Sequence, residues 1–427
     1  MTFKIRIPKI KTLQFLCIYM SMQYYGGRIY TLLGSAIFFS LSLILSAFVL
    51  VYEGNLLFHS EKKINGYIFG VTAMAVWLAL SIFYTMGNMT VGTSLSVLSR
   101  FLLIYVSVGL DPENFLTRFI KMTVLFAFVS DVVYFSHFFG LTPLWRGISK
   151  VFYRIPSGMY FGGDTYGLFF LVFKVDDLAR NSYMFGEPGE YQMIINTCLY
   201  FLLFEGKSVQ LTPKYKTISI CLLLVTLVTI QSTSGFISLV IIIGMSLLQP
   251  NRFKENQSVK KVIVVCICAV LLYVLIFADE TSVFYQSFYR KVFSSDGQLD
   301  LQQGTAAARS MPYYLMAENL LQNPLQVIFG VGANGLAQTV VGRYTANGLV
   351  NFIMMCGLVF VVPLYLLMSA GHFQYGKNPA ATCCVILICL NQSVGQPDML
   401  SIYSVLLLLY PYIFQITHNR KNELCYE

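Results

Sequence analysis

The chain has 427 residues, of which 56% are hydrophobic and only 11% are charged, and its mean hydropathy is +0.65. Soluble proteins carry about 25% charged residues, so this composition excludes an ordinary water-soluble protein. The formal net charge of +9 could indicate an anionic partner, but membrane proteins also concentrate Lys and Arg in their cytoplasmic loops. The charge has to be divided between the two sides of the membrane before it is interpreted.

Long apolar runs recur along the chain, and they predict an all-α polytopic membrane protein. A transmembrane helix needs about 20 mostly apolar residues, and by this measure about twelve spans form one integral membrane domain over residues 1–427. The predicted spans are residues 11–25, 29–52, 65–84, 90–109, 116–139, 188–205, 216–231, 234–249, 260–278, 346–369, 379–392 and 398–416.

The short basic connections between these spans all fall on one side of the membrane. They are residues 4–11, 62–63, 207–216, 252–261 and 420–421. Because Lys and Arg gather on the cytoplasmic side, we predict a multi-pass membrane protein with both termini in the cytoplasm. The net charge is then topological and gives no reason to expect a nucleic-acid partner.

Two long connections, the first outer loop (residues 140–187) and the second outer loop (residues 279–345), are predicted to face outward. Loops of this length in a compact protein are usually functional. The first ends with Arg180 and Glu187, and the next span begins with Pro188 and Glu190. Proline suits the first turn of a helix and an acidic residue complements its dipole. A helix start does not require Arg180, whereas the planar guanidinium of an arginine, with its several N–H donors, is suited to binding phosphate.

Three further polar clusters occur at predicted outer ends of helices. Ser232 and Ser234 lie at a hairpin tip, where they form either a plain turn or the floor of a polar pocket. Arg309 precedes a stretch, residues 310–321, with the apolar spacing of a helix lying along the membrane interface. Arg343 and Asn347 precede the span at 346–369, where Arg343 is either a topological anchor or part of a site.

Two charged residues fall within predicted spans, Arg100 and Asp131. Ionisable groups in the membrane mark functional sites by default. Because their spans are neighbours in sequence, we expect the two residues to form a structural ion pair, with a role in binding lipid headgroups or substrate as the alternative.

Sequence motifs for metals, cofactors or nucleotides are absent. There is no Walker-type loop, no zinc-binding His pair and no Gly-x-Ser-x-Gly elbow, so we predict neither a metal nor a cofactor. The cysteine pairs Cys383–Cys384 and Cys266–Cys268 lack a second pair at zinc spacing and are expected to be packing residues.

Taken in order, these features resemble the O-antigen polymerase and ligase superfamily. The resemblance rests on Arg-x-x-x-x-Phe-Gly-Glu-Pro from Arg180, the Ser-x-Ser-Gly tip from Ser232, and the early Arg309 of the second outer loop. The loop then contains Asn-Pro and Gly-x-Gly-x-x-Gly before the next span. The motifs cover roughly residues 175–370, and the remainder is similar only in its pattern of spans.

The resemblance implies a glycosyltransferase of the lipid-dependent (GT-C-like) fold class, acting on sugars carried by undecaprenyl diphosphate outside the inner membrane. It implies polymerisation of O-antigen or capsular repeat units, with membrane lipids around the enzyme and a separate chain-length regulator protein as a partner. Arg180 and Arg309 match the arginines held to bind the diphosphate or the acceptor. Glu187 is the candidate base, Glu190 is the second candidate, and Arg343, Asn347, Ser232 and Ser234 are candidate substrate-binding residues.

Two positions depart from the family pattern. Many members have His–Asn where this chain has Ala346–Asn347, and Ser–Arg where it has Thr233–Ser234. A mechanism using that histidine is therefore not available, which favours a polymerase over a ligase. A transporter of lipid-linked oligosaccharides, a flippase, is the alternative from another class, because the same cations could grip a diphosphate.

Overall fold

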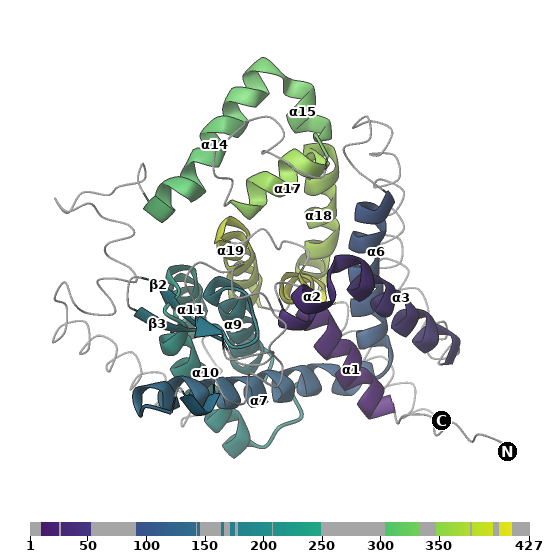
Figure 1. Cartoon of the computed structure of the whole chain (residues 1–427). Coiled ribbons are helices and arrows are strands. Elements are labelled where there is room, and N and C mark those ends of the chain that lie inside the picture. Colours follow the sequence, from purple (N-terminus) through teal and green to yellow (C-terminus); the bar gives the residue numbers. More distant parts are fainter. Residues whose placement is uncertain are drawn as a thin grey trace.

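The computed structural model describes residues 10–24, 27–52, 91–141, 143–145, 164–165, 171–175, 178–206, 208–248, 304–332, 347–375, 378–395 and 401–411. These residues are mostly helical (Figure 1). The helices of the first half are α1 (Ile10–Gln23), α2 (Arg28–Leu33), α3 (Ser35–Tyr52), α6 (Val91–Gly109), α7 (Pro112–Phe138), α9 (Pro188–Phe204), α10 (Pro213–Ile230) and α11 (Thr233–Leu247). Those of the second half are α14 (Gly304–Gln322), α15 (Pro324–Phe329), α17 (Gly348–Cys356), α18 (Leu358–Tyr375), α19 (Pro379–Gly395) and a last helix, Ile402–Pro411.

Two of the described helices, α7 and α10, are long and apolar enough to cross a membrane, and the pair α17 and α18 makes a third if it counts as one bent span. Shorter apolar helices cover Ala36–Val51, Thr233–Leu247, Pro379–Gly395 and Ile402–Pro411. The structure is thus that of a helical, membrane-embedded protein, but the predicted number of twelve spans is not confirmed. Two predicted spans, residues 65–84 and 260–278, lie outside the described residues.

Glycines interrupt two of the spans that the hydropathy pattern predicts as continuous. The predicted span 29–52 is divided at Gly34 into α2 and α3, and the span 346–369 at Gly357 into α17 and α18. Both glycines have positive φ angles, 78° and 82°, which L-residues with side chains rarely adopt. At Gly357 the two helix axes differ in direction by 117°.

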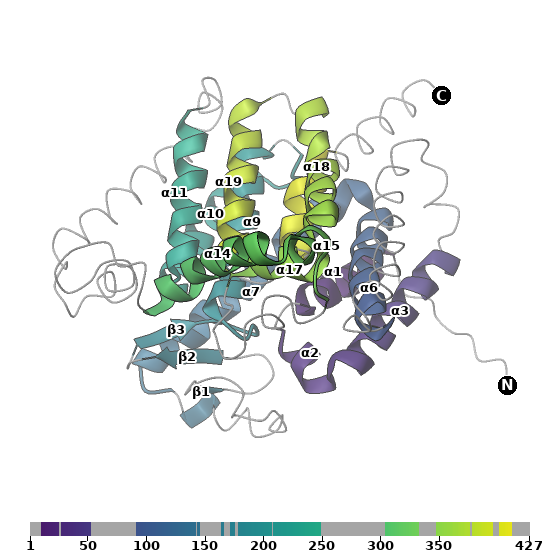
Figure 2. The ribbon, with the colours of Figure 1, turned by 90° about the horizontal axis from the view of Figure 1, so that it is seen from above.

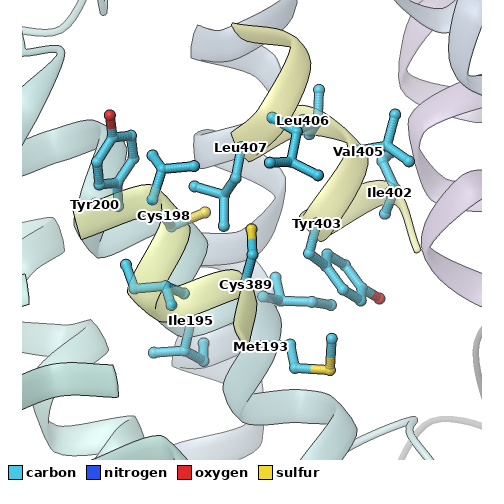
Figure 3. Packing of buried hydrophobic residues seen from close by; sticks show 14 of the residues in the cluster. Met193, Ile195, Cys198, Tyr200, Cys389, Ile402, Tyr403, Val405, Leu406 and Leu407 are labelled. Atoms are coloured by element: carbon cyan, nitrogen blue, oxygen red, sulfur yellow. The ribbon is translucent and has the colours of Figure 1, made fainter. Parts of the chain in front are cut away.

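Helix α9 lies at the centre of the bundle. It packs against α7, α10, α11 and α19, and nearly all of its residues are buried. A helix that is buried on all faces requires partners on every side. Its side chains Met193, Ile195 and Cys198 pack against Cys389 of α19 and against the last helix (Figure 3).

The first outer loop contains a small sheet that the all-α prediction missed. Strands β1 (Asp164–Thr165), β2 (Leu171–Val175) and β3 (Leu178–Asn181) form an antiparallel sheet in the order β1-β2-β3. Residue Arg180 of β3 pairs with Phe173 of β2. Strand β3 also contacts α7 and α10, so the sheet is joined to the helical bundle through this strand.

We call the part of the molecule around this sheet the sheet end. The α10–α11 hairpin turn and the first turn of α9 lie there, since β3 contacts α10 and leads directly into α9. Helix α14 crosses the bundle at the same end in Figure 2. The basic connections predict this end to face outward.

The predicted ion pair between Arg100 and Asp131 is wrong. The carboxylate of Asp131 lies 2.7 Å from the hydroxyl of Thr226, 3.1 Å from that of Thr229 and 3.2 Å from the amide of Asn181. The guanidinium of Arg100 lies instead over the ring of Tyr24, 5.2 Å from its centre. Neighbouring spans bring two helices together, but the face that each residue occupies decides its partner.

Candidate functional site

Arg180 is fixed to the end of helix α10 by one edge of its guanidinium. Its Nε donates to the carbonyl of Ile230 at 3.4 Å, and its Nη2 donates to the carbonyl of Gln231 at 2.8 Å. Carbonyl groups at the end of a helix lack partners within the helix and carry partial negative charge, so they attract a cation. An arginine has five N–H donors, and three remain on Arg180 for another acceptor.

Helix α9 begins with a capping box at Glu187 and Glu190. The carboxylate of Glu190 accepts from the backbone N–H groups of Gly186 at 3.1 Å and Glu187 at 3.4 Å. The carboxylate of Glu187 accepts from the N–H of Glu190, and Pro188 occupies the first turn, where its missing N–H costs nothing. The Glu187 side chain is exposed, whereas that of Glu190 is turned back onto the chain.

Arg309 is carried by α14 and is connected to α17 through its backbone. The amide of Asn347 donates to the carbonyl of Arg309 at 2.8 Å, and its Oδ1 accepts from the N–H of Val350 at 3.1 Å. Asn347 therefore caps the N-terminus of α17 and holds α14 in place with the same side chain, which is fully buried.

The three charged residues Arg180, Glu187 and Arg309, which we call the charged cluster, lie close enough for the charge of Glu187 to affect the pKa of both arginines. Burial lowers the pKa of Arg180 to about 10; the charge of Glu187 opposes this effect and that of Arg309 adds to it. Burial also lowers the pKa of Arg309, again opposed by Glu187. With a pKa of about 10, Arg180 stays protonated at neutral pH. The structure thus brings Arg309 near Arg180 and Glu187, which precede it by more than about 120 residues in the sequence.

The position of α14 depends on a close backbone contact between two glycines. The N–H groups of Val331 and Gly332 donate to the carbonyls of Met354 and Met355 at 2.7 and 3.2 Å. A Cβ atom on Gly330 would lie 2.6 Å from the carbonyl oxygen of Met355, and one on Gly357 would lie 2.4 Å from the carbonyl carbon of Phe329. We call this contact the glycine joint. It fixes α15, and with it α14, to the bend between α17 and α18.

The two predicted serines make contacts within the protein. Ser232 caps α11, accepting from the N–H of Gly235 at 3.4 Å. The carbonyl of Ser234 accepts from the amide of Asn391 in α19 at 2.7 Å, so this residue lies between α11 and α19. Its buried hydroxyl has no hydrogen-bond partner among the described residues. Their predicted role in binding substrate stays a prediction, and Arg343 lies outside the described residues.

Several polar residues around Arg180 were not singled out from the sequence. The amide of Gln231 donates to the hydroxyl of Tyr134 at 3.2 Å, and Gln231 has a positive φ of 52° that ends α10. Asn181 and the two threonines of α10 surround Asp131. The sequence signal for the threonines is their spacing, since Thr226 and Thr229 share one face of the apolar second half of α10.

Comparisons with known proteins identify no relatives of this chain. No family model, no curated protein and no solved structure matches it.

Proposed function

We propose that this protein is a glycosyltransferase of the bacterial inner membrane that polymerises oligosaccharide repeat units carried by undecaprenyl diphosphate. The product is O-antigen or capsular polysaccharide, formed on the outer face of the membrane by an enzyme of the lipid-dependent class. The observation that carries the proposal is the charged cluster, in which Arg180 and Arg309 both interact electrostatically with Glu187.

A lipid diphosphate fits the chemistry of this cluster. Arginine binds phosphate oxygens through two parallel hydrogen bonds, and Arg180 keeps three N–H donors beyond those that hold α10. The cluster adjoins an apolar bundle with two or three candidate membrane spans. The anionic head of a polyprenyl diphosphate therefore suits the arginines of the charged cluster, and its polyprenyl tail suits the apolar bundle.

The proposed reaction is a displacement at the anomeric carbon of the donor sugar. The acceptor hydroxyl oxygen forms a bond to this carbon while the bond from the carbon to the diphosphate oxygen breaks. The electron pair of that bond goes to the diphosphate, where Arg180 and Arg309 stabilise the developing charge. Glu187, whose side chain is exposed and whose charge acts on both arginines, accepts the proton of the hydroxyl. No metal is needed in this scheme.

The two glutamates are expected to differ in their response to replacement by glutamine. Glu187→Gln should lower the rate of glycan lengthening by about 100-fold or more, because a general base contributes about that much. Glu190→Gln should lower it less than about threefold, since glutamine also completes a capping box. The measurement is the initial rate of polymer formation by each purified variant. Equal losses in both variants would exclude Glu187 as the base.

The proposed function is tested by supplying purified protein in detergent with an undecaprenyl-diphosphate-linked repeat unit. Lengthening of the glycan supports a polymerase and excludes a flippase, because translocation has no meaning in detergent. A ligase is distinguished in cells lacking the protein. Loss of a polymerase leaves one repeat unit on the lipid A-core, whereas loss of a ligase leaves none. Absence of lengthening by a folded protein would contradict the proposal.

A further inference from the structure

The carboxylate of Asp131 is buried at the junction of three elements near the charged cluster. Asp131 belongs to α7 and is 5% exposed. Its Oδ2 lies 2.7 Å from the hydroxyl of Thr226, and its Oδ1 lies 3.1 Å from that of Thr229 and 3.2 Å from the amide nitrogen of Asn181. All of these partners are neutral. A carboxylate removed from water in this way needs such donors, so the junction is built around it.

Asn181 connects this carboxylate to the residue that we assign to the diphosphate. It follows Arg180 directly, at the end of β3, and is 1% exposed. Its amide nitrogen lies within 3.0–3.2 Å of Asp131, Ser130 and Thr229. Its Oδ1 accepts from the N–H of Tyr183 at 3.2 Å, which supports a turn where Tyr183 has a positive φ of 47°.

Strand β3 is therefore held to the bundle at two successive residues. Arg180 binds the end of α10, and Asn181 binds α7 through Asp131 and Ser130. The chain then turns toward Glu187. The position of Asn181 thus determines the position of the preceding residue, Arg180, in the strand. It also determines where the turn to Glu187 begins. Groups that stabilise a transition state lose much of their effect when displaced by about 1 Å.

We propose that Asp131 is a positioning residue, which holds Arg180 in place for the lipid diphosphate through Asn181. The proposal rests on the proposed function of Arg180. Hydrogen bonds to an ionised group are about twice as strong as those between neutral groups, so a carboxylate fixes Asn181 more firmly than a neutral acceptor. Asp131 contacts no substrate in this scheme, because its oxygens are buried and occupied by protein donors.

The test is a double-mutant cycle between Asp131→Asn and Arg180→Ala. Asp131→Asn keeps the shape but replaces one acceptor oxygen with a donor, which faces other donors. We expect it to lower kcat for glycan lengthening about tenfold and to weaken binding of undecaprenyl diphosphate. In the Arg180→Ala protein the same change should alter kcat less than twofold, because residues that act through one another are not additive.

The matched control is Asp111→Asn, at the other end of the same helix. Asp111 caps α7 and forms an ion pair with Arg118 at 2.6 Å, so its loss also removes carboxylate interactions of α7. The fold-decrease in kcat caused by Asp111→Asn should multiply with the fold-decrease caused by Arg180→Ala. If Asp131→Asn also multiplies with Arg180→Ala, Asp131 acts on general stability and the inference is wrong.

A second variant keeps the test decisive if Asp131→Asn does not fold. Thr226→Val removes one donor to Asp131, at 2.7 Å, without changing the side-chain shape or the hydrogen bond between Asn181 and Thr229. It should give a smaller loss of kcat with the same lack of additivity, and additive behaviour of Thr226→Val would overturn the inference. A different result would show that the proposed function is wrong: Arg180→Ala alone would then leave the binding of undecaprenyl diphosphate unchanged.

Discussion

Replacing either arginine of the charged cluster with alanine is expected to lower the rate of glycan lengthening by about 100-fold or more. Removal of one group that stabilises a developing negative charge typically costs about 100- to 1000-fold in rate. Arg180→Lys and Arg309→Lys should each lose about tenfold, because lysine keeps the charge but not the fork that binds two oxygens. Initial rates of purified variants and titration with undecaprenyl diphosphate measure these effects.

Arg118→Lys is the control for this comparison. Arg118 pairs with Asp111 at the far end of α7, so its replacement perturbs an ion pair away from the cluster and should leave the rate nearly unchanged. Asn347→Asp adds a second check, since aspartate still caps α17 but cannot donate to the carbonyl of Arg309. It should lower the rate less than Arg309→Ala does. Unchanged rates in both alanine variants would contradict a diphosphate clamp.

Gly357→Ala is expected to destabilise the protein by about 3 kcal/mol or more, or to prevent its folding. The new methyl group would lie 2.4 Å from the carbonyl carbon of Phe329 and 2.5 Å from the carbonyl oxygen of Ile328, and a φ of 82° is unfavourable for alanine. Overpacking costs about 1–3 kcal/mol and backbone strain about as much again. Gly330→Ala should behave similarly. Thermal unfolding in detergent and the yield of folded protein report the loss.

Two other glycines separate the causes of this effect. Gly34 has a φ of 78°, but no atom lies within 4 Å of the place that a Cβ would take, so Gly34→Ala shows strain alone and should cost less. Gly244 lies inside α11 with open space around it, and Gly244→Ala should raise stability by up to about 1 kcal/mol. A Gly357→Ala protein as stable as Gly34→Ala would show that the glycine joint is not closely packed.

Helix boundaries followed closely from the sequence wherever a local signal marks them. The predicted span 188–205 is α9, Pro188–Phe204, and the predicted span 234–249 is α11, Thr233–Leu247. Proline and the capping residues Glu187 and Ser232 define these starts. Hydropathy counts apolar residues but not backbone angles, so it could not separate α17 from α18 at Gly357. The short strands β1–β3 carry too few residues for a recognisable alternation.

The placement of the candidate residues was predicted in part, whereas their roles stay predictions. That Arg180, Glu187 and Arg309 lie together follows from their common position at the predicted outer ends of helices. The place of Glu190 within the capping box is visible in the local sequence, and its carboxylate accepts from the N–H of Gly186; its candidate role as a base stays a prediction. The partners of Asp131 could not be predicted, because the rotation of a helix about its axis depends on packing against several neighbours rather than on the next span alone.

The end cap that Arg180 places on α10 ties two regions of the molecule together. One guanidinium binds the carbonyls of Ile230 and Gln231, and the turn that follows reaches α19 through Ser234 and Asn391. A displacement of this hairpin therefore moves the donor atoms of Arg180, and a force on Arg180 is transmitted to α19. Hydrogen bonds thus connect the segment that carries the arginine to both α10 and α19.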